Sequence, residues 1–476
     1  MKYLHRHTKI IFTIGPATEN EEIIAALILH KVDICRLNMA HGSLDWAKAT
    51  IRKVKEICKQ VSRQIAIMMD IKGPEIRTGE IDGVWFLAKD ELVDLIINAN
   101  SHNKNLYESK YRKVTINYPE IIDDVHINDI ILVDNGLIQL KILEKHKDYL
   151  RCVVLTPGVL KSNRHVNLPG IKINLPAITD KDKRDLSVAI EEDVDFIALS
   201  FVRDPFDIIE LKNYLLQYNY SPRIIAKIEN QSGIENIDSI IKESDAIMIA
   251  RGDLGIECPY EKLPLIQRQI VNKCIDNCKP VIVATHMLES MIVAPVPTRA
   301  EVTDVSNAVF EEADCIMLSA ETSIGEYPLK CIEVMKKISL EIEAAIPRSF
   351  RQNIELRLPK NKMLRSAVVL AQQLKRACIV VFSHSGAGAQ LISSLRPTRV
   401  PLFVFTDSES TLRQMRILWG IQPHLIEFNK DRNVTINYAL QELLNTDVMQ
   451  KGDYAVILTS IEVDEKPVET IQLRRL

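Results

Sequence analysis

The chain has 476 residues, 46% of them hydrophobic and 26% charged, which is the balance of an ordinary globular protein with room for about three domains. The net charge of −3 offers no basic surface field and argues against a nucleic-acid partner. The N-terminus lacks the apolar segment of a secretion signal, and no apolar run approaches the roughly 20 residues of a membrane span, so we expect a cytoplasmic protein.

Short apolar runs alternate with helical patterns at the start of the chain. The runs at 9–14, 32–37 and 64–69 each end in polar or helix-breaking residues. A helix is predicted over 21–29, with acidic residues in the first turn, where the helix dipole favours them. Strands that alternate with helices predict a parallel sheet.

The pattern changes between residues 79 and 166, where the apolar runs are short and are broken by Asp, Asn and Gly. The sequence Asp134-Asn135-Gly136 between apolar residues predicts a hairpin or a bulge. We therefore expect a small β-rich domain over 79–166, inserted between a strand and its helix, where it could act as a lid.

The alternation of strands and helices resumes at residue 167. Five more apolar runs end at Ser200, Lys227, Arg251, Thr285 and Ser319. With the first three, these make about eight strand-like runs, which predict a (β/α)₈ barrel formed by residues 1–78 and 167–346. Further apolar runs at 378–382, 400–405 and 454–458 predict a smaller C-terminal α/β domain over 347–476.

Nine cysteines are scattered without the spacing of a disulfide framework, which fits a reducing compartment. Cys274 and Cys278 lie four residues apart in a helical pattern. This spacing allows a metal pair, but thiols in the core or on the helix surface are the simpler interpretation.

A lysine and two carboxylates follow neighbouring runs. Lys227 and Glu229 end one run and Asp253 the next, and in a parallel barrel such positions face the ligand. Two carboxylates suit Mg²⁺, and a lysine beside them provides a point charge for a phosphate or enolate oxygen. This group indicates phosphoryl transfer or enolate chemistry. An ordinary ion pair between Lys227 and Glu229 is the alternative.

Other polar residues also follow the predicted strands. They are Arg36, Asn38, Asp70, Lys72, Glu75, Arg77, Thr285, Ser319 and Glu321. Arg251-Gly252-Asp253 opens a predicted helix whose N–H groups could hold a substrate carboxylate. The strand ends thus offer a metal site, a monovalent-cation site, phosphate-binding cations and a carboxylate site.

Taken together, several motifs are highly specific. They lie at 13–17, 36–38, 72–79, 166–169, 227–230, 250–256, 284–291 and 297–301. Through them the chain resembles the pyruvate kinase family over essentially its whole length, and most strongly over the barrel. The resemblance implies transfer of the phosphoryl group of phosphoenolpyruvate to ADP by a homotetramer.

The resemblance also implies roles for single residues. Glu229 and Asp253 would bind Mg²⁺ or Mn²⁺, while Lys227 would neutralise charge on the phosphoryl group and the enolate oxygen. Such roles fit a loose transition state in which positioning and electrostatics dominate. The other implied residues are Arg36 and Arg77 at the phosphate, Gly252 and Thr285 at the substrate, Thr285, Ser319 and Glu321 at the proton path, and Asn38, His41, Arg77 and Arg164 at the nucleotide.

A K⁺ site is implied at Asn38, Asp70 and the carbonyl of Ile71. Ala40 stands where the family has a serine, which suggests looser binding. Glu75 occupies the position where K⁺-independent members carry a lysine, so we predict that the activity depends on K⁺.

Other departures from the family pattern concern the nucleotide and an effector. Arg164-His165 replaces a usual Lys-Gly, and a guanidinium fork differs from a point charge. His41 could also be a loop histidine bonded only to backbone. The segment 383–388 resembles the family's sugar-phosphate loop, or is a plain strand-to-helix turn. The segment 460–467 is acidic where the family often has a glycine-rich loop, and carboxylates repel a bisphosphate. We therefore predict that fructose 1,6-bisphosphate does not activate the enzyme.

Two other function classes remain open. Another barrel enzyme that makes an enolate on Mg²⁺, such as an aldolase or a phosphotransferase with a histidine carrier, would not require the inserted domain or the group of Arg36, Asp70 and Glu75. A degenerate homologue that serves as a metabolite sensor is favoured by Ala40 and Arg164 and opposed by the intact charge set.

Overall fold

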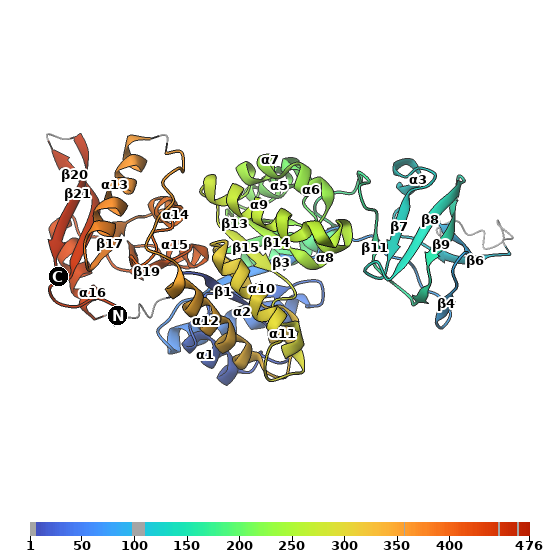
Figure 1. The fold of residues 1–476 in the computed structure, drawn as a ribbon, viewed down its shortest axis with the longest axis horizontal. Helices are drawn as coiled ribbons and strands as arrows, with labels where there is room; N and C mark the ends of the chain where they lie inside the picture. The colour runs from blue at the N-terminus through green and yellow to red at the C-terminus, as the bar shows by residue number, and fades with distance from the viewer. Residues whose placement is uncertain (1–5, 98–109, 357, 446–447, 464–465) are drawn as a thin grey trace.

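The structure is a computed structural model, and it describes residues 6–97, 110–356, 358–445, 448–463 and 466–476. Three bodies lie in a row along its longest axis (Figure 1). The barrel occupies the middle, an α/β body lies at one end and a β-rich body at the other. In the described part of the chain, no helix combines the length and the hydrophobicity that crossing a membrane requires.

The middle body is a closed barrel of eight parallel strands, as the sequence predicts. Around the barrel the order is β1-β16-β15-β14-β13-β12-β3-β2. The strands are β1 Lys9–Thr13, β2 Ile34–Asn38, β3 Ala66–Ile71, β12 Phe196–Leu199, β13 Arg223–Ile228, β14 Ala246–Ala250, β15 Val281–Ala284 and β16 Cys315–Met317. Because helices cover their outer faces and side chains fill the interior, these strands are apolar along nearly their whole length.

Helices surround the barrel. They are α1 Glu21–Leu29, α2 Leu44–Gln60, α4 Asp180–Glu191, α5 Pro205–Leu216, α6 Gln231–Glu235, α7 Ile237–Glu243, α8 Arg251–Glu257, α9 Leu263–Asp276, α10 Arg299–Phe310, α11 Ala320–Ser323 and α12 Pro328–Ala345, with short 3₁₀ turns η1 Tyr260–Lys262 and η2 Glu289–Ile292. Thr179 and Thr298 form capping boxes at the starts of α4 and α10. Helix α1 has the predicted bounds.

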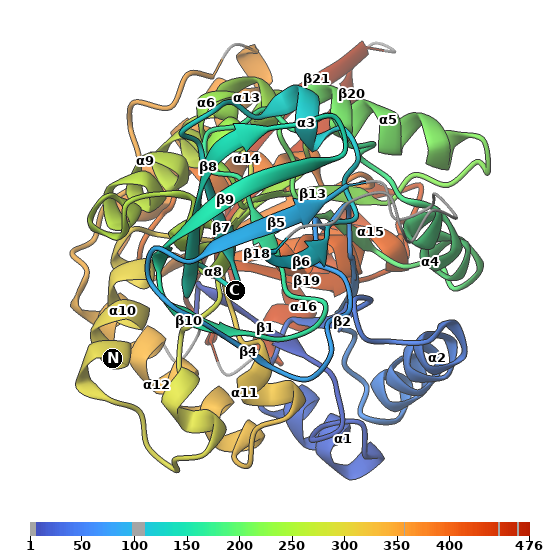
Figure 2. The same ribbon diagram turned by 90° about the vertical axis from the view of Figure 1, so that its right-hand side faces the viewer.

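The β-rich body lies beyond the carboxyl ends of the barrel strands, and in the end-on view the barrel helices surround it (Figure 2). It holds a six-stranded sheet, β11-β7-β8-β9-β5-β6, and a two-stranded sheet, β10-β4, around a core of its own. The elements are β4 Trp85–Leu87, β5 Leu92–Ile96, β6 Arg112–Thr115, α3 Ile121–Asp124, β7 Ile130–Val133, β8 Ile138–Lys145, β9 Tyr149–Thr156, β10 Gly158–Leu160 and β11 Val166–Asn167. The predicted hairpin joins β7 to β8, with Asp134, Asn135 and Gly136 at positive φ.

The α/β body has a five-stranded sheet in the order β19-β18-β17-β20-β21. Its elements are α13 Pro359–Gln373, β17 Ala377–Phe382, α14 Ala387–Ser394, β18 Leu402–Thr406, α15 Glu409–Gln414, η3 Met415–Ile417, β19 Ile421–Leu425, α16 Arg432–Leu444, β20 Tyr454–Val463 and β21 Lys466–Arg475. Three of the strands match predicted runs, whereas β19 and β21 were not predicted. Instead of a loop, most of the segment 460–467 forms the ends of β20 and β21, and its residues 464–465 lie outside the described residues.

Candidate active site

Lys227 lies at the centre of a buried polar cluster at the carboxyl end of the barrel. Its Nζ lies 2.7 Å from Ser200 Oγ, 3.0 Å from Glu229 Oε1 and 3.1 Å from Asp70 Oδ1. The residue is only 9% exposed. Burial alone would lower the pKa of Lys227, but the carboxylates of Asp70 and Glu229 outweigh it and raise that pKa. The ammonium group therefore stays protonated, in a site with little exposure to solvent.

Asp70 joins Lys227 to a second cation. Arg36 donates from Nε to Asp70 Oδ2 at 2.7 Å and from Nη1 to Thr13 Oγ1 at 2.9 Å. Burial would raise the pKa of Asp70, but Lys227 and Arg36 lower it below its ordinary value. Asp70 is thus an ionised carboxylate between two cations, and it fixes Arg36 beside Lys227.

Glu229 and Asp253 are the two carboxylates predicted to hold a metal. Glu229 Oε2 accepts the backbone N–H of Phe201 at 2.7 Å, and Asp253 lies in the first turn of α8. Burial raises the pKa of Glu229 to about 7; the charge of Lys227 opposes this shift and the charge of Asp253 adds to it. In the described part of the chain, no group of three or more His, Cys, Asp or Glu side chains is placed to hold a metal ion. An ion here would take these two carboxylates and complete its shell with water or substrate, as Mg²⁺ does.

The residues that follow β3 form an ion-pair group at the start of the β-rich body. Glu75 Oε2 lies 2.6 Å from Arg77 Nε and 3.0 Å from Lys72 Nζ. Burial would raise the pKa of Glu75, but hydrogen bonds from Arg77 and Lys72 lower it. Arg77 also donates to the carbonyl of Asn163 at 2.8 Å, so this group ties the barrel to the β-rich body.

Thr285 is held against the start of α8. The backbone N–H of Gly252 donates to Thr285 Oγ1 at 2.7 Å. The sequence suggested that this N–H would be free to hold a substrate carboxylate, but in the structure it already has a partner. Arg251 donates to the carbonyl of Thr285 at 2.6 Å and pairs with Asp304 at 2.6 Å. Thr285 and His286 have φ of +68° and +54°, a conformation that non-glycine residues adopt at a cost and that tends to occur at functional sites.

Glu321 braces two loops. Its Oε2 accepts the N–H of Ser319 at 2.7 Å and its Oε1 accepts the N–H of Leu288 at 3.1 Å. The side chain is 2% exposed. Both oxygen atoms therefore face backbone, and Glu321 joins the turn after β15 to the turn after β16.

The residues predicted at the nucleotide are more widely spread. Asn38 ends β2 beside Asp70 in β3, and its Oδ1 accepts the N–H of Ala40 at 3.2 Å. His41 is exposed in the turn that follows. Arg164 lies in the β-rich body, where Nη1 is 3.4 Å from Asp134 Oδ1.

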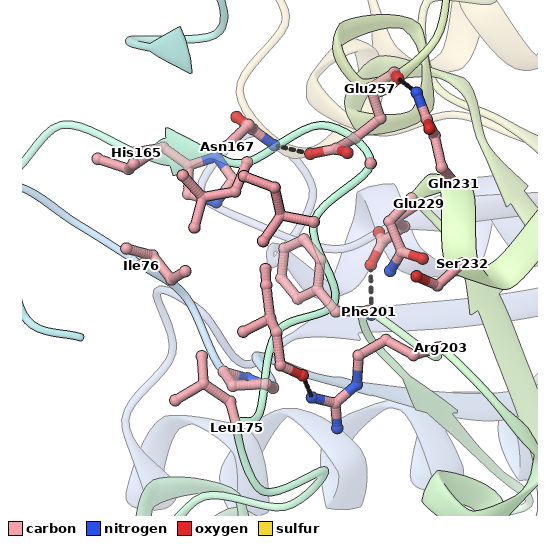
Figure 3. Close-up of a pocket in the computed structure, with 17 residues that line it drawn as sticks. Ile76, His165, Asn167, Leu175, Phe201, Arg203, Glu229, Gln231, Ser232 and Glu257 are labelled. Atoms are coloured by element: carbon pink, nitrogen blue, oxygen red, sulfur yellow. Dashed lines mark hydrogen bonds between the residues drawn. The ribbon is translucent and has the colours of Figure 1, made fainter. Parts of the chain in front are cut away.

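A pocket that is open to solvent lies between β11, α6 and the end of α8 (Figure 3). Asn167 donates from Nδ2 to Glu257 Oε1 at 2.9 Å, and Gln231 donates to the Glu257 carbonyl at 2.7 Å. Burial raises the pKa of Glu257 to about 7. Glu229 lines the same pocket, which thus connects this carboxylate with β11, the strand that returns from the β-rich body.

Sequence reasoning missed three residues of the site. Ser200 and Thr13 bond to Lys227 and Arg36, and Arg251 holds Thr285. Ser200 carries the same signal as the predicted residues, since it directly follows an apolar run. Cys274 and Cys278, predicted as core or helix-surface thiols, are free thiols; Cys274 is buried and Cys278 is partly buried.

Two family models match the chain. The model described as "Pyruvate kinase, barrel domain" matches residues 5–332, and "Pyruvate kinase, alpha/beta domain" matches residues 361–472. Among curated relatives, a pyruvate kinase of Staphylococcus epidermidis is 38% identical over 97% of this chain and 79% of its own length. A pyruvate kinase of Staphylococcus aureus is 38% identical over 97% of this chain and 78% of its own.

A solved structure gives the same result. The crystal structure of a pyruvate kinase from Cryptosporidium parvum matches with a TM-score of 0.90 and 32% identity, over 99% of this chain and 96% of that one. The chain therefore belongs to the pyruvate kinase family, the phosphotransferases that convert phosphoenolpyruvate and ADP into pyruvate and ATP.

Proposed function

We propose that the cluster around Lys227 carries out this transfer. The observation that supports the proposal most directly is the buried ammonium of Lys227, held between Asp70, Glu229 and Ser200. In a site that excludes water, such a fixed charge stabilises negative charge that develops on the phosphoryl group and on the enolate oxygen. Arg36, fixed by Asp70, contacts the phosphate from a neighbouring strand.

Glu229 and Asp253 suit a divalent ion, Mg²⁺ or Mn²⁺, because both are carboxylates that follow the adjacent strands β13 and β14. The ion supplies charge neutralisation for the phosphate and the enolate oxygen when it is bound. K⁺ would take oxygen atoms of Asn38, Asp70 and Ile71. These lie at the ends of neighbouring strands, and the methyl group of Ala40 adds no ligand.

The remaining predicted residues bind and orient. The carboxylate of phosphoenolpyruvate accepts the N–H of Gly252 in exchange for Thr285 Oγ1, which frees that hydroxyl for the reacting enolate. Glu321 accepts the N–H of Ser319 and so fixes the turn after β16, which borders the path along which a proton reaches the enolate carbon. Asn38, His41, Arg77 and Arg164 bind ADP, with Arg164 brought in by the β-rich body acting as a lid.

We also propose that the enzyme is a homotetramer in the cytoplasm, and this part of the proposal rests only on what is typical of the pyruvate kinase family.

The test is pyruvate formation from phosphoenolpyruvate and ADP with Mg²⁺, in the presence and absence of K⁺. We expect activity that rises strongly with K⁺. Activity that is indifferent to K⁺ would keep the reaction and refute the role given to Glu75 and Asn38. No turnover under either condition would favour the metabolite-sensor alternative.

A further inference from the structure

The ammonium of Lys227 has three N–H donors and three close neighbours in this structure. Asp70 at the end of β3 and Ser200 after β12 accept hydrogen bonds from it at 3.1 and 2.7 Å, and Glu229 after β13 forms an ion pair with it at 3.0 Å. The shortest contact is made by the only neutral group. Ser200 is 4% exposed, so water has little access to this hydroxyl.

The orientation of the Ser200 hydroxyl follows from its other neighbours. Its oxygen lies 2.8 Å from the carbonyl oxygen of Ile71 and 3.4 Å from Asp70 Oδ1. A hydroxyl can donate one hydrogen bond, and the closer carbonyl of Ile71 accepts it. The lone pairs of Ser200 Oγ are thereby left to accept an N–H of Lys227.

The three contacts of Lys227 differ in whether they can be exchanged for a substrate oxygen during the reaction. The carboxylate of Asp70 is already committed to Arg36, and the hydroxyl of Ser200 is committed to the Ile71 carbonyl. Both are fixed by a further partner from the barrel wall. Glu229 is held to the ammonium by an ion pair and also belongs to the proposed metal site, so its contact is the one that can be exchanged for a substrate oxygen.

We propose that Ser200 is a positioning residue for Lys227, whose hydroxyl, oriented by the Ile71 carbonyl, fixes the ammonium so that its third N–H points at the transferring phosphoryl group and the enolate oxygen. The inference rests on the role proposed for Lys227. With contacts to both Ser200 and Asp70, the ammonium group cannot change its position by rotation of the flexible Lys227 side chain. With the Asp70 contact alone it can change position, and a misplacement of about 1 Å lowers the rate about 10²-fold.

Ser200→Ala removes the hydroxyl, and Ser200→Cys keeps the size of the side chain but offers only a weak acceptor. The matched control is Ser244→Ala, which removes an equally buried hydroxyl that bonds to the Ile240 carbonyl, away from the site. We expect both Ser200 variants to lose about 10²-fold in kcat, while KM for phosphoenolpyruvate changes less than about threefold. The control should keep the parent's kcat.

A second readout separates positioning from general damage. Pyruvate methyl protons exchange with D₂O through the enolate, whose oxygen Lys227 stabilises, so NMR should show slower exchange in Ser200→Ala at full pyruvate occupancy. A kcat and an exchange rate within about threefold of the control in both Ser200 variants would overturn the inference. If the parent protein itself forms no pyruvate, the proposed function fails instead, and the two failures remain distinguishable.

Discussion

At the scale of single residues, the site depends on buried charged side chains that are paired with one another and have little access to solvent. Arg36 and Lys227 face the carboxylates of Asp70 and Glu229, and all four are at least nine-tenths buried. A buried charge is tolerated only when it is paired and hydrogen-bonded. Removal of one member therefore leaves its partners uncompensated, and the loss is larger than the contact itself.

Lys227→Met keeps the length of the side chain and removes the charge. We expect kcat to fall by about 10³-fold or more, because the fixed charge at the enolate oxygen is lost and the neighbouring cation, Arg36, is already bound to Asp70 and Thr13. Steady-state kinetics gives kcat, and calorimetric titration with phosphoenolpyruvate checks that binding persists. Lys273→Met, which removes a surface ammonium paired with Asp238, is the control. A kcat within tenfold of the parent would contradict the role of Lys227.

Glu257 predicts a pH dependence of stability. Burial raises its pKa to about 7, whereas a glutamate in the unfolded chain has about 4.3. The folded state therefore holds a proton that the unfolded state loses, so the stability present below about pH 4 is lost as the pH rises to about 7.

Glu257→Gln cannot ionise and keeps an acceptor for Asn167. We expect this variant to gain about 3 kcal/mol on the parent between pH 4.5 and pH 8, from about 1.4 kcal/mol per unit of pKa difference. Melting curves of metal-free protein at both pH values measure the gain. The control is Glu235→Gln at an exposed position of α6. A difference that stays constant with pH would contradict the shift.

At the scale of elements, the active end of the barrel depends on how turns are braced against each other. Arg251, the first residue of α8, spans from the carbonyl of Thr285 to the carboxylate of Asp304 on α10. It is 8% exposed and uses several donors of its planar fork at once. A lysine is a single point charge and cannot make these contacts together.

Arg251→Lys should therefore loosen the strained turn at Thr285 without a change of net charge. We expect kcat/KM for phosphoenolpyruvate to fall about 10- to 100-fold, since Thr285 and Gly252 no longer share a fixed geometry. Arg52→Lys, which changes a largely exposed guanidinium paired with Glu192, should leave kcat/KM unchanged. Equal kinetics for both variants would show that the fork of Arg251 is dispensable.

The same elements show what a sequence can reveal. Lys227, Glu229 and Asp253 were predictable because parallel strands present their carboxyl ends at one edge, so a polar residue after an apolar run is placed by the fold itself. The orientation of Glu321 was not, because it depends on two turns, after β15 and β16, meeting in space. Strand β21 was missed because it is a polar edge strand with no apolar run.

At the scale of the whole molecule, the barrel is joined to the α/β body at the end opposite to the site. Arg396 lies 2.6 Å from Asp314, which directly precedes β16, and its guanidinium lies 5.3 Å from the centre of the Trp419 ring. Asp314 also accepts the N–H of Trp419 at 3.0 Å. The two bodies are also joined elsewhere: Arg413 lies 2.8 Å from Asp195, and Arg223 of β13 donates to the carbonyl of Ser385 at 3.4 Å.

The α/β body has a pocket of its own. It is lined by the segment 383–388, by Lys430 and Arg432, and by Glu469. The loop precedes α14, as predicted, and the N–H of Gly386 donates to Ser383 Oγ at 3.0 Å, so one donor of the loop is already used. The imidazole of His384 is paired with Asp407 at 2.7 Å.

Fructose 1,6-bisphosphate should not activate this enzyme. The sequence of the segment 460–467 carries three carboxylates and one lysine where the family often has a glycine-rich loop, and carboxylates repel a bisphosphate. An effector shifts a conformational equilibrium only by its difference in affinity between the two states, so a ligand that does not bind shifts nothing. We expect the half-saturating phosphoenolpyruvate concentration to stay the same with and without the sugar bisphosphate, with equal free Mg²⁺ in both assays. A clear fall in that concentration would show that the pocket binds the bisphosphate despite the acidic segment.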